Sequence, residues 1–130
     1  KLQGTSLGVR KVKESIISNK SFAFAVRIVK LYNYLVREKK EYHISKQIQK
    51  SGTSIGANVA EAQRAQSSAD FVAKMKIALK EASETQYWMR LLHETGYITV
   101  REFESLHGEV VEIIKILTAI CKHYPQDNQK

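Results

Sequence analysis

The residues of this 130-residue chain that could support catalysis are few and poorly grouped. Helical bundles hold di-iron sites with two Glu-x-x-His pairs and two further glutamates. The sequence has one such spacing, from Glu104 to His107, and neither His43 nor His123 completes a second pair. An isolated pair of this kind is usually a surface coincidence. We therefore expect no metal site, no cofactor and no metal catalysis.

Two further features of the sequence could indicate chemistry. Gly52 and Gly56, followed by Ala60 at the same spacing, could suggest a phosphate-binding loop, but no strand precedes them and no Gly-Lys-Thr sequence follows. Glycine within a helix costs roughly 1 kcal/mol relative to alanine, so the two glycines indicate instead that another backbone approaches closely. The single cysteine, Cys121, excludes an intrachain disulfide and falls on an apolar stripe. No Ser-His-Asp or Cys-His spacing can be argued, and the sequence predicts a protein that is not an enzyme.

Polar residues also follow the buried edge of a helix predicted over residues 44–65. Ser51 and Asn58 fall inside its apolar arc, and Ser54 and Glu61 lie just beside that arc. An unsatisfied buried polar group costs about 1–3 kcal/mol. These four residues should therefore either form a buried polar network with neighbouring helices or line a hydrated site.

Positive charge is concentrated in the first part of the chain. Residues 1–50 hold 12 Lys or Arg against 3 Asp or Glu, whereas residues 51–130 hold 9 against 10. This asymmetry favours a partner such as RNA, DNA or a ribonucleoprotein, although an ordinary solvated face gives the same pattern. The candidate phosphate contacts are Lys20, Arg27, Lys30, Arg37, Lys46 and Lys50. The first four share one arc of a helix predicted over residues 21–40.

That same helix is too apolar for a single subunit. Its apolar residues cover roughly 220° of the circumference, which is wider than the side that a monomeric bundle buries. Tyr87 and Trp88 fall on the outer side of the third predicted helix, and exposed tyrosine and tryptophan are typical of protein interfaces. The candidate oligomer contacts are Phe24, Leu31, Ile77, Tyr87, Trp88 and Leu91. The alternative function is accordingly a structural or adaptor oligomer that docks another protein and has no role with nucleic acid.

Helices must position all of these residues. Ser67 or Ser68 followed by Asp70 predicts the start of a third helix, and Thr99 with Glu102 predicts a capping box for a fourth. Period-two strand patterns are absent, and the connections are short. The fold class expected is therefore all-α, an up-down-up-down antiparallel four-helix bundle.

The expected organisation is a flexible basic N-terminal arm over residues 1–14, the bundle over residues 15–124 and a polar tail over residues 125–130. No signal peptide and no apolar run of about 18 residues is present, which predicts a cytoplasmic protein without membrane contact.

Several stretches resemble one known family. They are residues 20–22 (Lys-Ser-Phe), residues 54–61 (Ser-Ile-Gly-Ala-Asn-Val-Ala-Glu), Asp70-Phe71, and residues 77–82 and 84–88. They look like the bacterial four-helix-bundle proteins, also called 23S rRNA-intervening sequence proteins and grouped under an S23 ribosomal-protein name. The resemblance covers residues 15–123 and implies a four-helix bundle that assembles into a homopentamer around a central pore, in a family with no established catalytic function. More distantly, the chain resembles the accessory variability determinant of diversity-generating retroelements, which implies a basic pentamer that binds nucleic acid and a reverse transcriptase.

Overall fold

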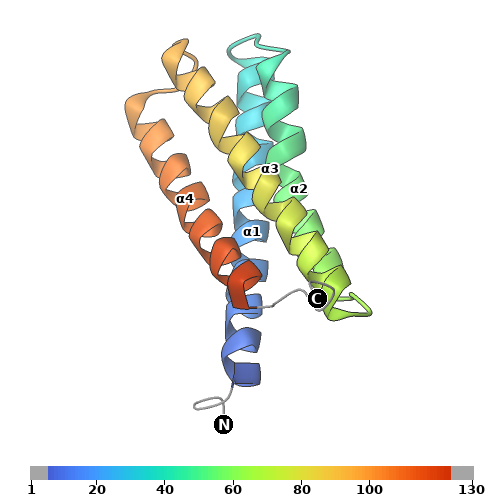
Figure 1. The fold of residues 1–130 in the computed structure, drawn as a ribbon. Coiled ribbons are helices and arrows are strands. Elements are labelled where there is room, and N and C mark those ends of the chain that lie inside the picture. The colour runs from blue at the N-terminus through green and yellow to red at the C-terminus, as the bar shows by residue number, and fades with distance from the viewer. Residues whose placement is uncertain (1–5, 124–130) are drawn as a thin grey trace.

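The computed structural model describes the backbone of residues 6–123 and the side chains of Val12 and residues 14–123. The four helices are α1 (Ser6–Arg37), α2 (Ile44–Ala62), α3 (Ser68–Glu94) and α4 (Val100–His123). Helices that follow one another in the chain pack side by side, and α4 returns to pack against α1 (Figure 1). The predicted all-α antiparallel four-helix bundle is confirmed. The polar tail predicted over residues 125–130 lies outside the described residues, as do residues 1–5 of the predicted arm.

The α1 helix is much longer than the sequence predicted. It runs without interruption from Ser6 to Arg37, so residues 6–14 are helical and do not form the loose arm that we expected. Ile17 and Phe24 are fully buried on either side of Asn19, whose side chain is exposed and leaves the helix intact. Once a helix is nucleated, each added residue costs little, so α1 can extend beyond its packed part. Its first turns project past the other helices (Figure 1).

Capping side chains begin the last two helices, as the sequence predicted. The Ser67 hydroxyl accepts a hydrogen bond from the Asp70 N–H at 3.0 Å, which places Ser67 at the N-cap of α3. At the start of α4, the Glu102 carboxylate accepts the Thr99 N–H at 2.8 Å and the Thr99 hydroxyl accepts the Glu102 N–H at 3.1 Å. This reciprocal pair is the predicted capping box. Between the two helices, Gly96 adopts a φ of 85°, which glycine tolerates without strain.

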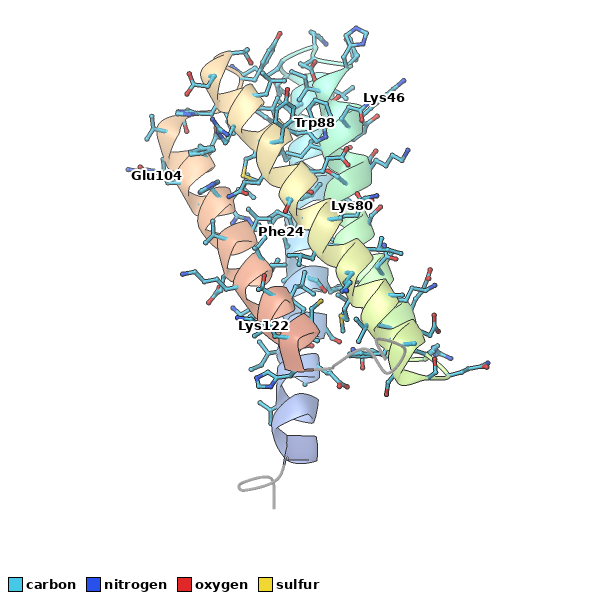
Figure 2. All side chains as sticks on the ribbon, viewed as in Figure 1. Phe24, Lys46, Lys80, Trp88, Glu104 and Lys122 are labelled. Atoms are coloured by element: carbon cyan, nitrogen blue, oxygen red, sulfur yellow. The ribbon has the colours of Figure 1, made fainter. Side chains whose placement is uncertain are left out.

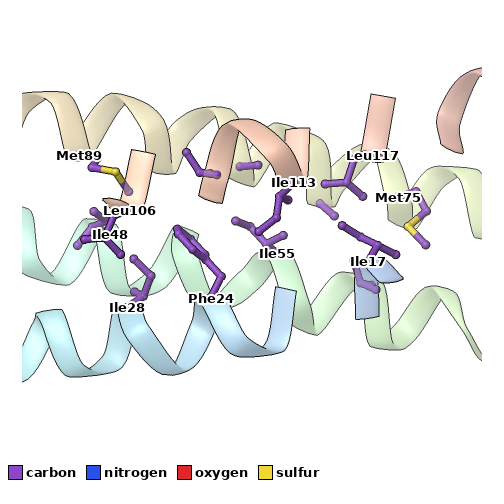
Figure 3. Close-up of a cluster of buried hydrophobic side chains, with 14 of the residues drawn as sticks. Ile17, Phe24, Ile28, Ile48, Ile55, Met75, Met89, Leu106, Ile113 and Leu117 are labelled. Carbon is purple, nitrogen blue, oxygen red and sulfur yellow. The ribbon is translucent and has the colours of Figure 1, made fainter. Parts of the chain in front are cut away.

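The core is built from one apolar stripe on each helix. Large side chains from all four helices meet along the bundle axis, and the prominent ones are Ile17, Phe24, Ile28, Ile48, Ile55, Met75, Met89, Leu106, Ile113 and Leu117 (Figure 3). Burying a side chain of this size contributes about 1.5–3 kcal/mol, so this shared interior is the main source of stability.

Two glycines allow α1 and α2 to approach closely. A Cβ atom at Gly52 would lie 2.9 Å from the Cγ atoms of Ile28, and one at Gly56 would lie 3.3 Å from the carbonyl oxygen of Ser21. A Cβ contact below 3.0 Å requires a neighbouring atom to move. The predicted approach of another backbone is therefore seen at Gly56, next to Ser21 of α1, whereas the atoms that crowd Gly52 belong to the side chain of Ile28.

Candidate nucleic-acid interface

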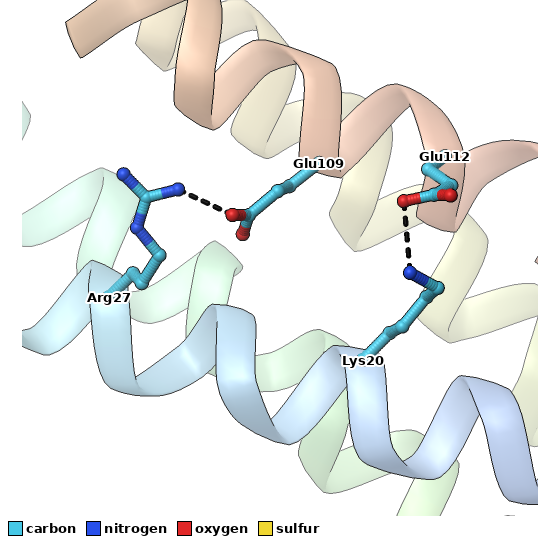
Figure 4. A network of polar contacts seen from close by, with 4 residues as sticks. All are labelled: Lys20, Arg27, Glu109 and Glu112. Carbon is cyan, nitrogen blue, oxygen red and sulfur yellow. Dashed lines mark hydrogen bonds and ion pairs between the residues drawn. The ribbon is translucent and has the colours of Figure 1, made fainter.

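The four cations that were expected to share one solvent-facing arc of α1 divide into two pairs. Lys20 and Arg27 reach across to α4, where Lys20 Nζ lies 3.0 Å from Glu112 Oε1 and the Arg27 guanidinium donates to the Glu109 carboxylate (Figure 4). These four side chains are only partly exposed, between 38% and 56%. Two of the six candidate phosphate contacts are therefore already occupied by carboxylates of the same chain.

The other four candidates lie at one end of the bundle. Lys30 and Arg37 are exposed on the last turns of α1, and Lys46 and Lys50 are exposed on the first turns of α2. None of the four forms an ion pair within the part of the chain that the structure describes. Because α1 and α2 are antiparallel, all four lie toward the turn that joins them. Figure 2 places Lys46 at this end and Lys122 at the opposite end.

Two further lysines at this end were missed by the sequence reasoning. Lys39 and Lys40 are exposed in the α1–α2 turn, and Lys40 adopts a φ of 56°. The sequence contains the signal, two adjacent lysines, but at 100° per residue both fall outside the arc that Lys30 and Arg37 share on the predicted helix. We refer to the six residues Lys30, Arg37, Lys39, Lys40, Lys46 and Lys50 as the cationic end.

A buried carboxylate fixes the shape of the cationic end. Glu41 accepts hydrogen bonds from the N–H groups of His43 and Ile44 at 3.1 and 2.9 Å, and of Ser45 at 2.7 Å. It thereby satisfies the free N–H groups at the start of α2, where the N-cap residue His43 makes no side-chain bond. Burial by itself would raise the pKa of Glu41, but the three N–H donors favour the charged form and hold its pKa below the ordinary value. The sequence reasoning missed this cap, because Glu41 lies two residues before the N-cap.

The candidate oligomer contacts do not form one surface. Phe24 is fully buried in the core, so its prediction as an interface residue is wrong for the chain as folded. Leu31 and Trp88 are half-buried against the core, and Leu91 is also only partly exposed. The remaining two, Ile77 and Tyr87, are exposed by 41% and 56% on α3.

The tryptophan is held by its own helix. Trp88 donates its indole N–H to the Glu84 carboxylate at 3.0 Å, and Tyr87 meets the indole edge-on with ring centroids 5.0 Å apart. These contacts fix the ring against α3 and satisfy its single donor. The exposed part of this cluster is therefore mainly the Tyr87 ring and Ile77.

A more exposed apolar surface lies on α1 and was not singled out from the sequence. Phe22 is 71% exposed, and Val26 and Val29 each leave 39% of their surface open. Beside Phe22, a hollow of about 370 Å³ runs between α1 and α2 along Ala25 and Gly56. The wide apolar arc of this helix predicted unburied apolar surface, but it did not identify the residues. We refer to Phe22, Val26 and Val29 as the apolar face of α1.

The predicted buried polar network is reduced to one pair. Ser51 is buried, and its hydroxyl accepts a hydrogen bond from the Thr85 hydroxyl of α3 at 2.9 Å. Ser54 and Asn58 are half-buried and bond to carbonyl groups one turn back in α2 itself. Glu61 is exposed and faces Lys74 at 3.5 Å, so its prediction as a buried residue is wrong. A residue at the border of an apolar arc can lie on the solvent side of the helix, and helical periodicity alone does not show on which side it lies.

The histidines near the α3–α4 turn pack around a phenylalanine. Phe103 stacks between His93 and His107, with ring centroids 4.5 and 4.9 Å away. His107 Nε2 lies 3.0 Å from Gln86 Nε2, while Glu104 is exposed. Among the described residues, no three His, Cys, Asp or Glu side chains are grouped closely enough to hold a metal ion. The same part of the chain contains no helix with the length and apolarity needed to cross a membrane.

Known proteins match the chain over most of its length. The family model described as 23S rRNA-intervening sequence protein matches residues 13–119. One similar solved structure is the crystal structure of a protein with unknown function from the S23 ribosomal protein family of Bacteroides thetaiotaomicron. The two sequences are 55% identical, the match covers 85% of this chain and 98% of the other, and the TM-score is 0.84. No curated protein matches the chain.

Proposed function

The chain belongs to the 23S rRNA-intervening sequence protein family, and we propose that it is a non-enzymatic homo-oligomer that binds nucleic acid through its cationic end. The observation that carries this proposal is the gathering of six exposed lysine and arginine side chains at one end of the bundle. The ligand is the phosphate backbone of RNA or DNA, either free or within a ribonucleoprotein. Such contacts fix a ligand in place without reading its sequence.

The arrangement of the cationic end suits this role. Its cations come from two helices and the turn between them, and the Glu41 carboxylate is turned inward to the backbone of α2, where three N–H donors compensate its charge. Lys46 and Lys50 are one helical turn apart, so their side chains lie on the same side of α2. None of these cations is held in an ion pair among the described residues, so a phosphate backbone could contact several of them, with Glu38 as the one exposed acidic side chain in the same turn.

Fluorescence anisotropy with a labelled 20-nucleotide oligouridine tests the proposal. The variant K46Q/K50Q should bind more weakly than the parent chain, and its affinity should depend less on salt, since each lost phosphate contact removes roughly 0.7 from the slope of log K against log salt. The matched control is K122Q, which removes an exposed lysine at the opposite end of the bundle. Equal losses per charge in both variants would contradict a localised site.

The apolar face of α1 supports self-association, which is the second part of the proposal. Three large apolar side chains exposed next to one another are costly in a monomer, and such patches mark interaction surfaces. A subunit interface on this face would leave the cationic end of each subunit accessible. One nucleic-acid strand could then contact several cationic ends at once, which raises the overall affinity by multivalency. A pentamer is the assembly that the family resemblance implies.

Sedimentation velocity tests self-association. The parent chain should sediment as an oligomer, and F22Q should shift the population toward smaller species. The control is V100Q, which makes a similar apolar-to-polar change at a residue that is 58% exposed on α4. A parent chain that remains a 14.8 kDa monomer at high concentration would contradict this part.

A purely structural or adaptor oligomer is the alternative. It is favoured by the same apolar face and by exposed Tyr87 and Ile77 on α3. In that case F22Q would alter assembly, whereas the parent chain would bind no oligonucleotide even at low salt.

A further inference from the structure

The groove between α1 and α4 has walls of opposite charge. Two neighbouring hollows of about 360 and 300 Å³ lie along it, with Ala23, Leu31, Leu106 and Ile113 among their apolar lining. The charged side chains that line these hollows are Lys20, Arg27 and Lys30 on α1 and Glu102, Glu109 and Glu112 on α4. The groove therefore contains a cationic wall that faces carboxylates rather than solvent alone.

Two ion pairs connect these walls. Lys20 meets Glu112, and Arg27 meets Glu109, so the cations are held about two helical turns apart along α1 (Figure 4). All four side chains remain partly exposed, and ion pairs of this kind between long side chains are individually weak. A competing anion from solution can therefore reach the cations and replace the carboxylates.

Carboxylates and phosphates are alternative partners for the same cations. Both accept charge-assisted hydrogen bonds from lysine and arginine. We propose that Glu109 and Glu112 occupy the positions of nucleic-acid phosphates on Lys20 and Arg27, so that the chain masks a second phosphate-binding site with its own α4 helix. This inference rests on the proposed function, because the ligand is the same phosphate backbone that binds the cationic end.

The masking has a direct thermodynamic consequence. A phosphate that reaches Lys20 or Arg27 must first separate an ion pair and then lie near the released carboxylate. In the parent chain these two cations therefore contribute little to affinity, and the cationic end supplies most of it. Removing the two carboxylates makes both cations available without adding any positive side chain.

The test is the binding of labelled 20-nucleotide oligouridine to E109Q/E112Q, measured by anisotropy over a salt series. Each exposed pair that no longer competes should raise affinity roughly two- to fivefold. The salt slope should become steeper by about 1.4, because two further phosphates are contacted. The single variant E104Q, also on α4 but without an ion pair among the described residues, should change affinity less than E109Q or E112Q does.

A charge-balanced variant separates masking from net charge. K20Q/R27Q/E109Q/E112Q has the same formal charge as the parent chain, and it should bind with the parent's affinity and slope. Circular dichroism and the oligomer mass confirm that each variant is folded. Suppose that the parent chain binds oligouridine. The masking is then overturned, while the proposed function stands, if E109Q/E112Q gains no more affinity per removed charge than E104Q does. It is also overturned if the fourfold variant keeps the higher affinity of E109Q/E112Q. If neither the parent chain nor E109Q/E112Q binds, both are overturned.

Discussion

The α1 helix meets its two neighbours by different physical means. Against α2, Gly52 leaves no room for a side chain next to Ile28 and Gly56 lies close to the backbone of Ser21, although a hollow opens beside Phe22 on the outer side of this contact. Against α4, it leaves hollows that are crossed by ion pairs such as Lys20 with Glu112. The first contact is specified by shape and the second in part by charge. Charge-based contacts are the ones that a polyanion can compete for, so the two sides of α1 should respond differently to mutation and salt.

The largest stability effect is expected at the shape-based contact. In Gly52→Ala, the new methyl group would lie 2.9 Å from Ile28, so the helices must separate or Ile28 must move. Overpacking of this kind costs typically about 1–3 kcal/mol, and the better helix propensity of alanine returns at most about 1 kcal/mol. We expect a net loss of up to about 2 kcal/mol, measured by urea denaturation.

A double-mutant cycle checks the cause of this loss. Ile28→Ala removes the two Cγ atoms that would lie 2.9 Å from the new methyl group, so the two changes together should cost less than the sum of their separate costs. Strict additivity would show that the methyl group at position 52 does not contact Ile28, and the shape-based description would be wrong.

A smaller effect is expected where α1 turns into α2. Glu41→Gln keeps the size of the side chain but removes the charge that three N–H groups bind. Loss of a helix cap typically costs about 1 kcal/mol. Because the folded-state pKa of Glu41 is lowered, its contribution is complete above the ordinary value of 4.5 and is lost as the pH falls through the folded-state pKa.

The pH dependence is therefore the decisive readout for Glu41. The difference in unfolding free energy between the parent chain and Glu41→Gln should be largest near pH 7 and should shrink in acid. A difference that is equally large at pH 3 would contradict a role for the ionised carboxylate in capping α2.

The smallest stability effect is expected at the charge-based contact. Removing both partners in K20Q/E112Q should change the unfolding free energy by less than about 1 kcal/mol, because exposed ion pairs contribute little. The difference should decline further in 0.5 M salt. A loss as large as that of Gly52→Ala would mean that the α1–α4 contact depends on this pair, and the comparison between the two sides would fail.

The sequence predicted the parts of the fold that depend on local signals. The Ser67 and Thr99 caps and the close approach at Gly56 follow from residue types at fixed spacings, and the structure has all three. The predicted start of α1 at residue 21 was wrong, because Ile17 is buried and holds the preceding turns of the helix against the bundle.

The candidate site was harder to predict because it depends on partners in other helices. Helical periodicity places Lys20 and Arg27 on one arc, but it does not show that glutamates of α4 face them. It likewise cannot distinguish buried Phe24 from exposed Phe22, since a wide apolar arc includes both. These distinctions require the orientation of the helices about their own axes, which is set by packing of the whole bundle.

The salt dependence of oligouridine binding by the parent chain tests the central claim most directly. With four to six phosphate contacts at the cationic end, log K should fall linearly against log salt with a slope of about −3 to −4 per bound subunit. The claim would be contradicted if the parent chain bound no oligouridine at low salt. It would also be contradicted if the affinity stayed the same between about 50 and 200 mM salt, a range over which phosphate contacts weaken strongly.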